Sequence, residues 1–350
     1  MSWKNAFLKK ALKAICPLIP LHPQKERILV ISTTALGDTL WATPALCNLR
    51  ASFPNAYIAV LTSQVGLEVL KSNSSIDKLH LLEEPLLPRF FSLWKKLYQE
   101  RFDTILFFHA SQRLALPLAS LLGASRIVGT SGLQKGLDDL LTHPLPSQKQ
   151  HEIVRRLKIG ESIGAHTKTE SLFFSLNAEE TLPQRPGLWV AIHPGSKDAF
   201  KRWPAENFAS LGRRLKELLP CEILVTGSDA ERDLIKQVAS QIQGAHIVEP
   251  GLSLRKFGAL LNQMDLLVTN DTGPLHLATA LKRPVLGIYS STDPALCGPY
   301  KTAHSVALSK KPTCRPCLKR SCRSPFCFLQ IGVEEAVRMS YELLSGGVQK

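Results

Sequence analysis

The loop from Asp271 to His276 carries residues that can bind an anion. Its six residues read Asp-Thr-Gly-Pro-Leu-His and follow an apolar run that is typical of a buried parallel strand. Gly273 permits a tight turn, and Pro274 suits the first position of a helix, where a missing N–H costs nothing. Free backbone amides at the start of a helix bind phosphates well. We therefore expect the turn Asp271–Thr272–Gly273 and His276 to hold a phosphate group. A loop acid and a core histidine are the alternative.

A second loop joins a predicted strand, 189–193, to a predicted helix, 204–218. Gly195 and Ser196 in this loop offer amide and hydroxyl donors. Its cations are Lys197, Lys201 and Arg202. Cations grouped in this way can neutralise a developing diphosphate without a metal ion. A solvated basic loop is the alternative, but the preceding strand favours a functional site.

A third loop, 33–38, follows the apolar strand predicted at 27–32 and ends in Gly37 and Asp38. Ligands in open α/β sheets bind outside the carboxyl ends of the strands. Gly37 lets the backbone approach a ligand closely, and Asp38 at that edge can take a proton from a hydroxyl group. A helix cap is the alternative role of Asp38.

Two further acids, Asp229 and Glu231, follow the strand predicted at 222–226. Their carboxylates can hold ribose hydroxyls or the edge of a base. A plain helix cap is an equally good interpretation.

The cysteines gather late in the chain, at Cys314, Cys317, Cys322 and Cys327. Four thiolates can hold zinc, although this spacing is tighter than that of common zinc ribbons. Buried reduced thiols are the alternative, and we favour it. The sequence has no G-x-G-x-x-G, P-loop or H-E-x-x-H motif, which weakens nicotinamide, flavin, P-loop and zinc-protease interpretations.

The bulk composition describes a basic globular protein. The chain has 350 residues, of which 44% are hydrophobic, and a formal net charge of +14, which favours nucleic acid, anionic lipid or phosphorylated substrates. No apolar run approaches the ~20 residues that span a bilayer, and no cleavable signal peptide is evident. We therefore expect a cytoplasmic protein whose eight cysteines are mostly reduced.

Residues 1–25 contain a basic amphipathic segment. Apolar side chains recur at helical spacing, and lysines surround them. These residues are Trp3, Phe7, Leu8, Ala11, Leu12 and Ile15, with Lys4, Lys9, Lys10 and Lys13. The pattern predicts a helix at an anionic membrane surface, and a helix that covers the core of the protein is the alternative.

Apolar strands and helices alternate along the rest of the chain, which is the signature of βαβ units and parallel sheets. A polar, proline-containing stretch at 181–187 interrupts the pattern, and a strand is also expected at 172–176. We therefore predict two Rossmann-like α/β domains that face a central cleft. The predicted segments are a first domain at 26–180, the linker at 181–187, a second domain at 188–332 and a final helix at 333–350.

These loops together resemble glycosyltransferase family 9, the lipopolysaccharide heptosyltransferases. The likeness covers roughly residues 27–345 and depends on the order and spacing of short motifs. The motifs are Leu36-Gly37-Asp38, His193-Pro194-Gly195 with Lys201-Arg202-Trp203-Pro204, Asp271 to His276, and Thr292-Asp293-Pro294 with Gly298-Pro299-Tyr300. The late cysteines also resemble a cluster found in many members.

The resemblance implies a GT-B fold and an inverting, metal-independent transfer of heptose from ADP-heptose to the inner core of lipopolysaccharide. No cofactor is implied beyond this co-substrate, and the enzyme would work on the inner face of the inner membrane. The implied general base is Asp38, and Lys201 would contact the donor phosphates. The other implied donor contacts are Asp271, Thr272, Gly273 and His276, whereas members vary where this chain has Gly195 and Ser196.

Two other functions fit parts of the sequence. A GT-B transferase with another nucleotide sugar is one, because no motif reads the base or the sugar. A nucleic-acid-binding protein is the other, because of the net charge, but the chain lacks a recognisable helix-turn-helix, zinc-finger or stacking-aromatic motif. We expect no nucleic-acid partner.

Overall fold

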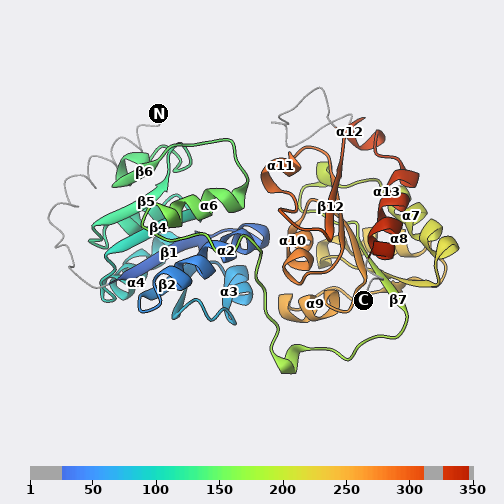
Figure 1. The fold of residues 1–350 in the computed structure, drawn as a ribbon, viewed down its shortest axis with the longest axis horizontal. Coiled ribbons are helices and arrows are strands. Elements are labelled where there is room, and N and C mark those ends of the chain that lie inside the picture. The colour runs from blue at the N-terminus through green and yellow to red at the C-terminus, as the bar shows by residue number, and fades with distance from the viewer. Residues whose placement is uncertain (1–25, 311–325, 347–350) are drawn as a thin grey trace. The chain divides into compact units, whose positions relative to one another are not determined.

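The computed structural model describes residues 26–310 and 326–346, which fold into two compact units. The first unit ends at Phe173 and the second begins at Phe174. Each unit contains one six-stranded parallel sheet flanked by helices (Figure 1). The predicted α/β class with two Rossmann-like parallel sheets is therefore confirmed.

The first unit has the strand order β3-β2-β1-β4-β5-β6. Its strands are β1 (Arg27–Thr33), β2 (Tyr57–Thr62), β3 (Lys78–Leu81), β4 (Thr104–Ala110), β5 (Arg126–Thr130) and β6 (His143–Leu145). Its α-helices are α2 (Leu36–Ser52), α3 (Gln64–Leu70), α4 (Leu86–Tyr98), α5 (Ala115–Ser120) and α6 (Glu152–Glu161). The order reverses between β1 and β4, so the loops after these two strands flank the point where open α/β sheets bind ligands.

Helices cover both faces of the first sheet. Alternate strand residues such as Leu29 and Ile105 pack with α4 and α5 in one core cluster, while α2 and α6 pack together outside that cluster. Helix α2 runs unbroken through Pro44, which cannot donate to the carbonyl of Leu40. The Thr43 hydroxyl donates to that carbonyl instead, at 2.7 Å. The helix that begins beside Asp38 therefore continues without a break to Ser52.

The second unit repeats the topology, with the order β12-β11-β10-β7-β8-β9. Its strands are β7 (Leu188–His193), β8 (Cys221–Val225), β9 (His246–Ile247), β10 (Leu266–Asn270), β11 (Val285–Tyr289) and β12 (Ser305–Ser309). Its α-helices are α7 (Ala205–Leu218), α8 (Arg232–Ala239), α9 (Leu254–Leu261), α10 (Gly273–Ala280), α11 (Pro294–Cys297), α12 (Phe326–Leu329) and α13 (Val333–Gly346). Here the order reverses between β7 and β10, so the predicted phosphate loops flank this switch point.

One core cluster joins α7, α8 and α13 to one face of the second sheet. On the other face Leu275 of α10 packs so closely on Gly287 of β11 that a Cβ at Gly287 would lie 2.4 Å from the leucine. The strand expected at 172–176 does not form. Its apolar character is explained by burial, because Phe174 is buried against Gly258 of α9.

Two sequence predictions fall outside the described residues. They are the membrane helix within 1–25 and the zinc site, of which Cys314, Cys317 and Cys322 are not described. Among the helices of the described ranges, none has the length and apolar character needed to cross a bilayer.

Candidate active site

Asp38 lies in the first turn of α2, at the carboxyl end of β1. Its carboxylate does not cap its own helix, because the N-cap position is Ala35 and has no side-chain hydrogen bond. Instead Asp38 Oδ1 accepts a hydrogen bond of 3.0 Å from Nη2 of Arg156 in α6. A quarter of the Asp38 side chain stays exposed, so the carboxylate is oriented and still reachable from solvent.

Arg156 is wholly buried, and its surroundings hold it in one orientation. Its Nη1 donates to the backbone carbonyl of Glu152 at 2.9 Å and to the Glu152 carboxylate at 2.6 Å. Its guanidinium also lies over the ring of Trp41, 5.6 Å from the centroid. Burial alone would raise the pKa of Glu152, but Arg156 and then Arg155 outweigh it and lower that pKa to about 2. The cluster therefore keeps a fixed positive charge beside Asp38.

His109 directly follows the buried part of β4, the strand beside β1 at the switch point. Burial lowers the pKa of His109, while the nearby Asp38 carboxylate acts in the opposite direction. The imidazole is therefore a neutral base close to Asp38. Sequence reasoning missed both His109 and Arg156. The signals were a histidine at the carboxyl end of a predicted strand and a Glu-Arg pair at i, i+4 in α6.

Lys201 and Asp271 form an ion pair at the switch point of the second sheet. The Lys201 Nζ lies 2.8 Å from Asp271 Oδ2, and the Thr292 hydroxyl donates to the same oxygen at 2.6 Å. The structure thus brings together residues from three of the motifs found in the sequence. Asp271 stays mostly buried, whereas a fifth of the Lys201 side chain is exposed, which leaves the ammonium able to reach a ligand.

Asn270 joins two of the loops that carry the predicted donor contacts. Its side-chain amide donates to the carbonyl of Pro194 at 2.8 Å, and its side-chain oxygen accepts from the backbone N–H of Trp203 at 2.9 Å. The Asp271–Gly273 turn follows directly, and α10 begins without a side-chain cap from Thr272. His276 is buried within the second unit.

The two acids predicted near the ribose have different environments. Glu231 is buried, and its carboxylate accepts bonds from the backbone N–H and hydroxyl of Ser228 in a capping box. It also lies directly under Gly195, where an added Cβ would sit 2.3 Å from the carboxyl carbon. Asp229 is exposed and pairs with Arg232. Glu231 therefore packs against the loop at Gly195 from inside the second unit, whereas the Asp229 side chain is exposed.

A cavity of about 320 Å³ opens beside the ends of β7 and β8, a volume at the small end of the ligand-pocket range. Its lining combines apolar side chains with polar groups: His193, Thr226, Gly227, Ser228, Asp229, Val248, Glu249, Pro250, Gly251, Leu252, Leu254 and Phe257. His193 Nδ1 lies 2.9 Å from the Thr226 hydroxyl. Burial lowers the pKa of His193 to about 4, with Glu231 acting in the opposite direction, so a neutral imidazole lines the cavity.

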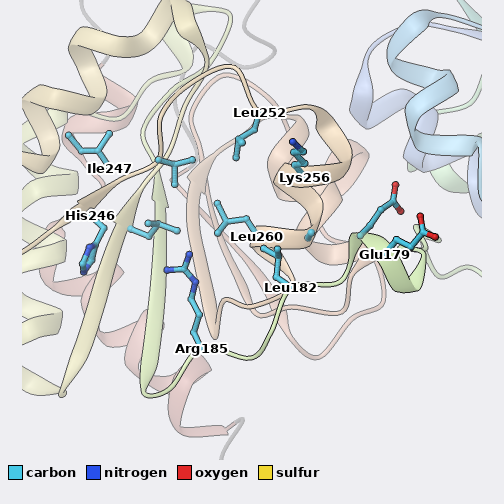
Figure 2. A pocket seen from close by; sticks show the side chains of 12 residues that line it. Glu179, Leu182, Arg185, His246, Ile247, Leu252, Lys256 and Leu260 are labelled. Atoms are coloured by element: carbon cyan, nitrogen blue, oxygen red, sulfur yellow. The ribbon is translucent and has the colours of Figure 1, made fainter.

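A larger pocket, of about 590 Å³, lies beside this cavity and shares Val248 and Leu252 with it. Figure 2 shows Leu182, Arg185 and Leu260 at this pocket, with His246 and Ile247 to one side. None of the predicted site residues lines it. Its size therefore does not mark it as the candidate site, because the predicted site residues of this unit lie at the carboxyl edge of the sheet and not in this pocket.

Comparison with known proteins identifies the family of this chain. The family model of glycosyltransferase family 9 (heptosyltransferase) matches residues 90–326. The chain belongs to this family. It is therefore a glycosyltransferase, as the sequence motifs predicted.

Three curated relatives match this chain over most of their own length. The chain is 25% identical to lipooligosaccharide heptosyltransferase 2 of Campylobacter jejuni over 91% of this chain and 98% of the relative. It is 26% identical to lipopolysaccharide heptosyltransferase 1 of Pseudomonas aeruginosa over 85% and 87%. Lipopolysaccharide heptosyltransferase 3 of Escherichia coli is 25% identical over 73% and 80%.

Solved structures confirm the fold. A family 9 glycosyltransferase from Veillonella parvula superposes with a TM-score of 0.79 at 22% identity, over 93% of this chain and 99% of that one. The Escherichia coli ADP-heptose lipopolysaccharide heptosyltransferase II superposes with a TM-score of 0.75 at 18% identity, over 92% and 99%. The enzyme therefore has the GT-B type of architecture, with two Rossmann-like units.

Proposed function

We propose that this enzyme transfers a heptose from ADP-heptose to the inner core of lipopolysaccharide, with inversion at the anomeric carbon. The observation that carries the proposal is the ion pair of Lys201 and Asp271 at the switch point of the second sheet, in a unit that also holds a cavity able to take a nucleoside. The identity of the sugar and of the acceptor rests on the relatives, which are named as heptosyltransferases of lipopolysaccharide or lipooligosaccharide.

The donor side of the proposal uses the second unit. The adenosine occupies the cavity lined by Val248, Leu252 and Phe257, and exposed Asp229 accepts from a ribose hydroxyl. The diphosphate draws Lys201 away from Asp271 and meets the amides at the start of α10. An Escherichia coli heptosyltransferase of the same fold has been solved with ADP. The similarity of this chain to that enzyme supports a nucleoside diphosphate as the ligand.

The acceptor side uses Asp38. In an inverting transfer, the acceptor hydroxyl attacks the anomeric carbon from the face opposite the departing ADP, and its proton passes to a base as the new bond forms. Asp38 is partly exposed and held by Arg156, so its carboxylate is presented in one orientation. The positive charge of Lys201 and the helix start stabilise the leaving diphosphate, and we propose that no metal ion is needed.

The membrane side of the proposal concerns residues 1–25. An acceptor embedded in a lipid surface suits an enzyme with a basic amphipathic segment, so we propose peripheral attachment to an anionic membrane on its cytoplasmic face. Deleting residues 1–20 should reduce sedimentation with anionic vesicles. Vesicle binding equal to that of the full chain would remove this part of the proposal.

A transfer assay tests the activity. The purified enzyme is mixed with ADP-heptose and a de-O-acylated inner-core acceptor, and mass spectrometry records the gain of one heptose. Parallel reactions contain UDP-glucose, GDP-mannose, or ADP-heptose with EDTA. We expect product from ADP-heptose with and without EDTA. Product from another nucleotide sugar alone would reassign the donor, and loss of activity with EDTA would refute a metal-free reaction.

A further inference from the structure

Helix α4 of the first unit presents large apolar side chains to solvent. Phe91 is 79% exposed and Leu87 is 72% exposed. The two residues are four positions apart, so they lie on the same side of the helix. Single exposed apolar residues are common on protein surfaces, but a Phe and a Leu stacked one turn apart form a ridge.

Leu87 and Phe91 do not take part in the packing of the core. Leu86, Leu93 and Leu97 are the buried residues of α4, and they belong to the core cluster of the first unit. Phe90 and Trp94 pack against the same cluster from its margin, and the Trp94 indole donates to the carbonyl of Leu121 at 2.8 Å. The core is therefore complete without Leu87 and Phe91, and the apolar arc of α4 extends beyond the face that the core covers.

The remaining exposed side of α4 is basic. Lys95 lies one turn beyond Phe91, and Lys96 follows it; both are exposed. Among the described residues, neither lysine makes an ion pair with a carboxylate. Arg89 pairs with Glu83 before the helix, at 2.6 Å. The helix itself contains no acidic residue, so its exposed surface combines an apolar ridge with unneutralised lysines.

We infer that α4 is a membrane-docking helix, whose ligand is the surface of an anionic bilayer. Leu87 and Phe91 enter the boundary between headgroups and acyl chains, and Lys95 and Lys96 meet lipid phosphates. Charge selects this occupant over a second copy of the chain, because two facing copies of α4 would bring like charges together. This contact is separate from the one proposed for residues 1–25, and it does not depend on the transfer reaction.

Vesicle sedimentation of the full chain tests this inference. The probes are vesicles of phosphatidylcholine with phosphatidylglycerol, and vesicles of phosphatidylcholine alone. The double variant Leu87→Ser/Phe91→Ser should bind the anionic vesicles at least about tenfold more weakly than the parent. The matched control Leu329→Ser/Tyr341→Ser removes exposed apolar side chains elsewhere and should bind as the parent does.

A fluorescence measurement separates α4 from residues 1–25. Phe91→Trp should gain quenching by brominated phosphatidylglycerol vesicles beyond that of the parent, whose five tryptophans include Trp3, and Tyr341→Trp should show no such gain. Unchanged vesicle binding by the serine double variant, or quenching of Phe91→Trp no greater than that of the parent, would overturn the inference. So would the finding that the serine variant loses only self-association in light scattering. The vesicles contain no sugar donor and no acceptor, so vesicle binding does not depend on the transfer reaction. The serine variant should keep its activity on the de-O-acylated acceptor. Failure of membrane docking is therefore distinguishable from failure of the proposed activity.

Discussion

Arg156 donates from Nη2 to Asp38 Oδ1 at 3.0 Å, across 118 positions of sequence, and Arg156 itself is completely buried. A buried guanidinium that lost its carboxylate partners would remain charged in a poorly solvated site. Glu152 supplies a second partner from the preceding turn of the same helix. Arg156 thus links the carboxylate proposed for catalysis to the scaffold of the first unit.

Arg156→Met should reduce turnover more than it reduces donor affinity. The variant removes the group that orients Asp38, so kcat should fall by about 10–10²-fold, the scale expected when a catalytic group is misplaced. The Kd for ADP should stay near that of the parent, because ADP is assigned to the second unit. Calorimetry and initial rates measure the two quantities. Arg156→Lys keeps the charge and should recover part of kcat, and equal losses in both variants would favour a purely structural role.

Asp38→Asn should lower turnover by about 10²–10⁴-fold, because the amide cannot accept the proton of the acceptor hydroxyl. Donor affinity should change little. His109→Gln is the necessary comparison, because a neutral imidazole lies close to Asp38. A larger loss of kcat in His109→Gln than in Asp38→Asn would move the role of general base to the histidine.

Lys201→Ala should weaken ADP binding by roughly 10–150-fold, the value of a lost hydrogen bond to a charged group. Among the residues that the structure describes, the variant also leaves Asp271 with Thr292 as its partner and no cation. Adding Asp271→Asn removes that unpaired charge and should recover part of the affinity. Titration calorimetry measures the Kd, and Lys236→Ala, an exposed lysine of α8, serves as control. Equal affinity of Lys201→Ala and Lys236→Ala for ADP would contradict the assignment.

Gly195→Ala should destabilise the second unit and displace the loop between β7 and α7, which carries Lys201. The new methyl group would lie 2.3 Å from the Glu231 carboxyl carbon, and Glu231 is buried and bonded to Ser228. Overpacking of this kind costs about 1–3 kcal/mol of unfolding free energy. Urea denaturation measures it, and Gly332→Ala, where a Cβ meets no atom within 4 Å, is the matched control. Equal stability of the two variants would show that Glu231 moves aside without cost.

The stability of the enzyme should fall between pH 6.5 and pH 4, in part through His193. Burial holds the pKa of His193 at about 4, below its ordinary value of 6.5. The unfolded chain therefore binds a proton in this window that the folded chain does not, so the contribution is present above pH 6.5 and is lost as pH falls toward 4. Denaturation of His193→Asn should show a shallower decline with falling pH. The exposed His304→Gln variant should follow the parent, and a decline in His193→Asn as steep as the parent's would exclude His193 as a source.

The alternation of elements was predictable from local patterns alone. Strands such as β1 and β10 are short apolar runs, and each is followed by a two-residue turn and a helix with a glycine in its first turn. The failed prediction at 172–176 has the same origin, because an apolar run records burial and does not say whether the buried segment is a strand. Phe174 is buried by packing against α9 without strand pairing.

The sequence by itself determined the two parallel sheets, the position of Asp38, Lys201 and Asp271 after their strands, and the family. These features follow from neighbouring residues, whose spacing sets periodicity and turn geometry. Tertiary structure decided which groups meet: Arg156 with Asp38, Lys201 with Asp271 and Glu231 with Gly195. It also decided that Glu231 is buried in a capping box while Asp229 is exposed beside the cavity. Two carboxylates two positions apart look alike in sequence, and only the packing of the chain around them fixes their solvation and partners.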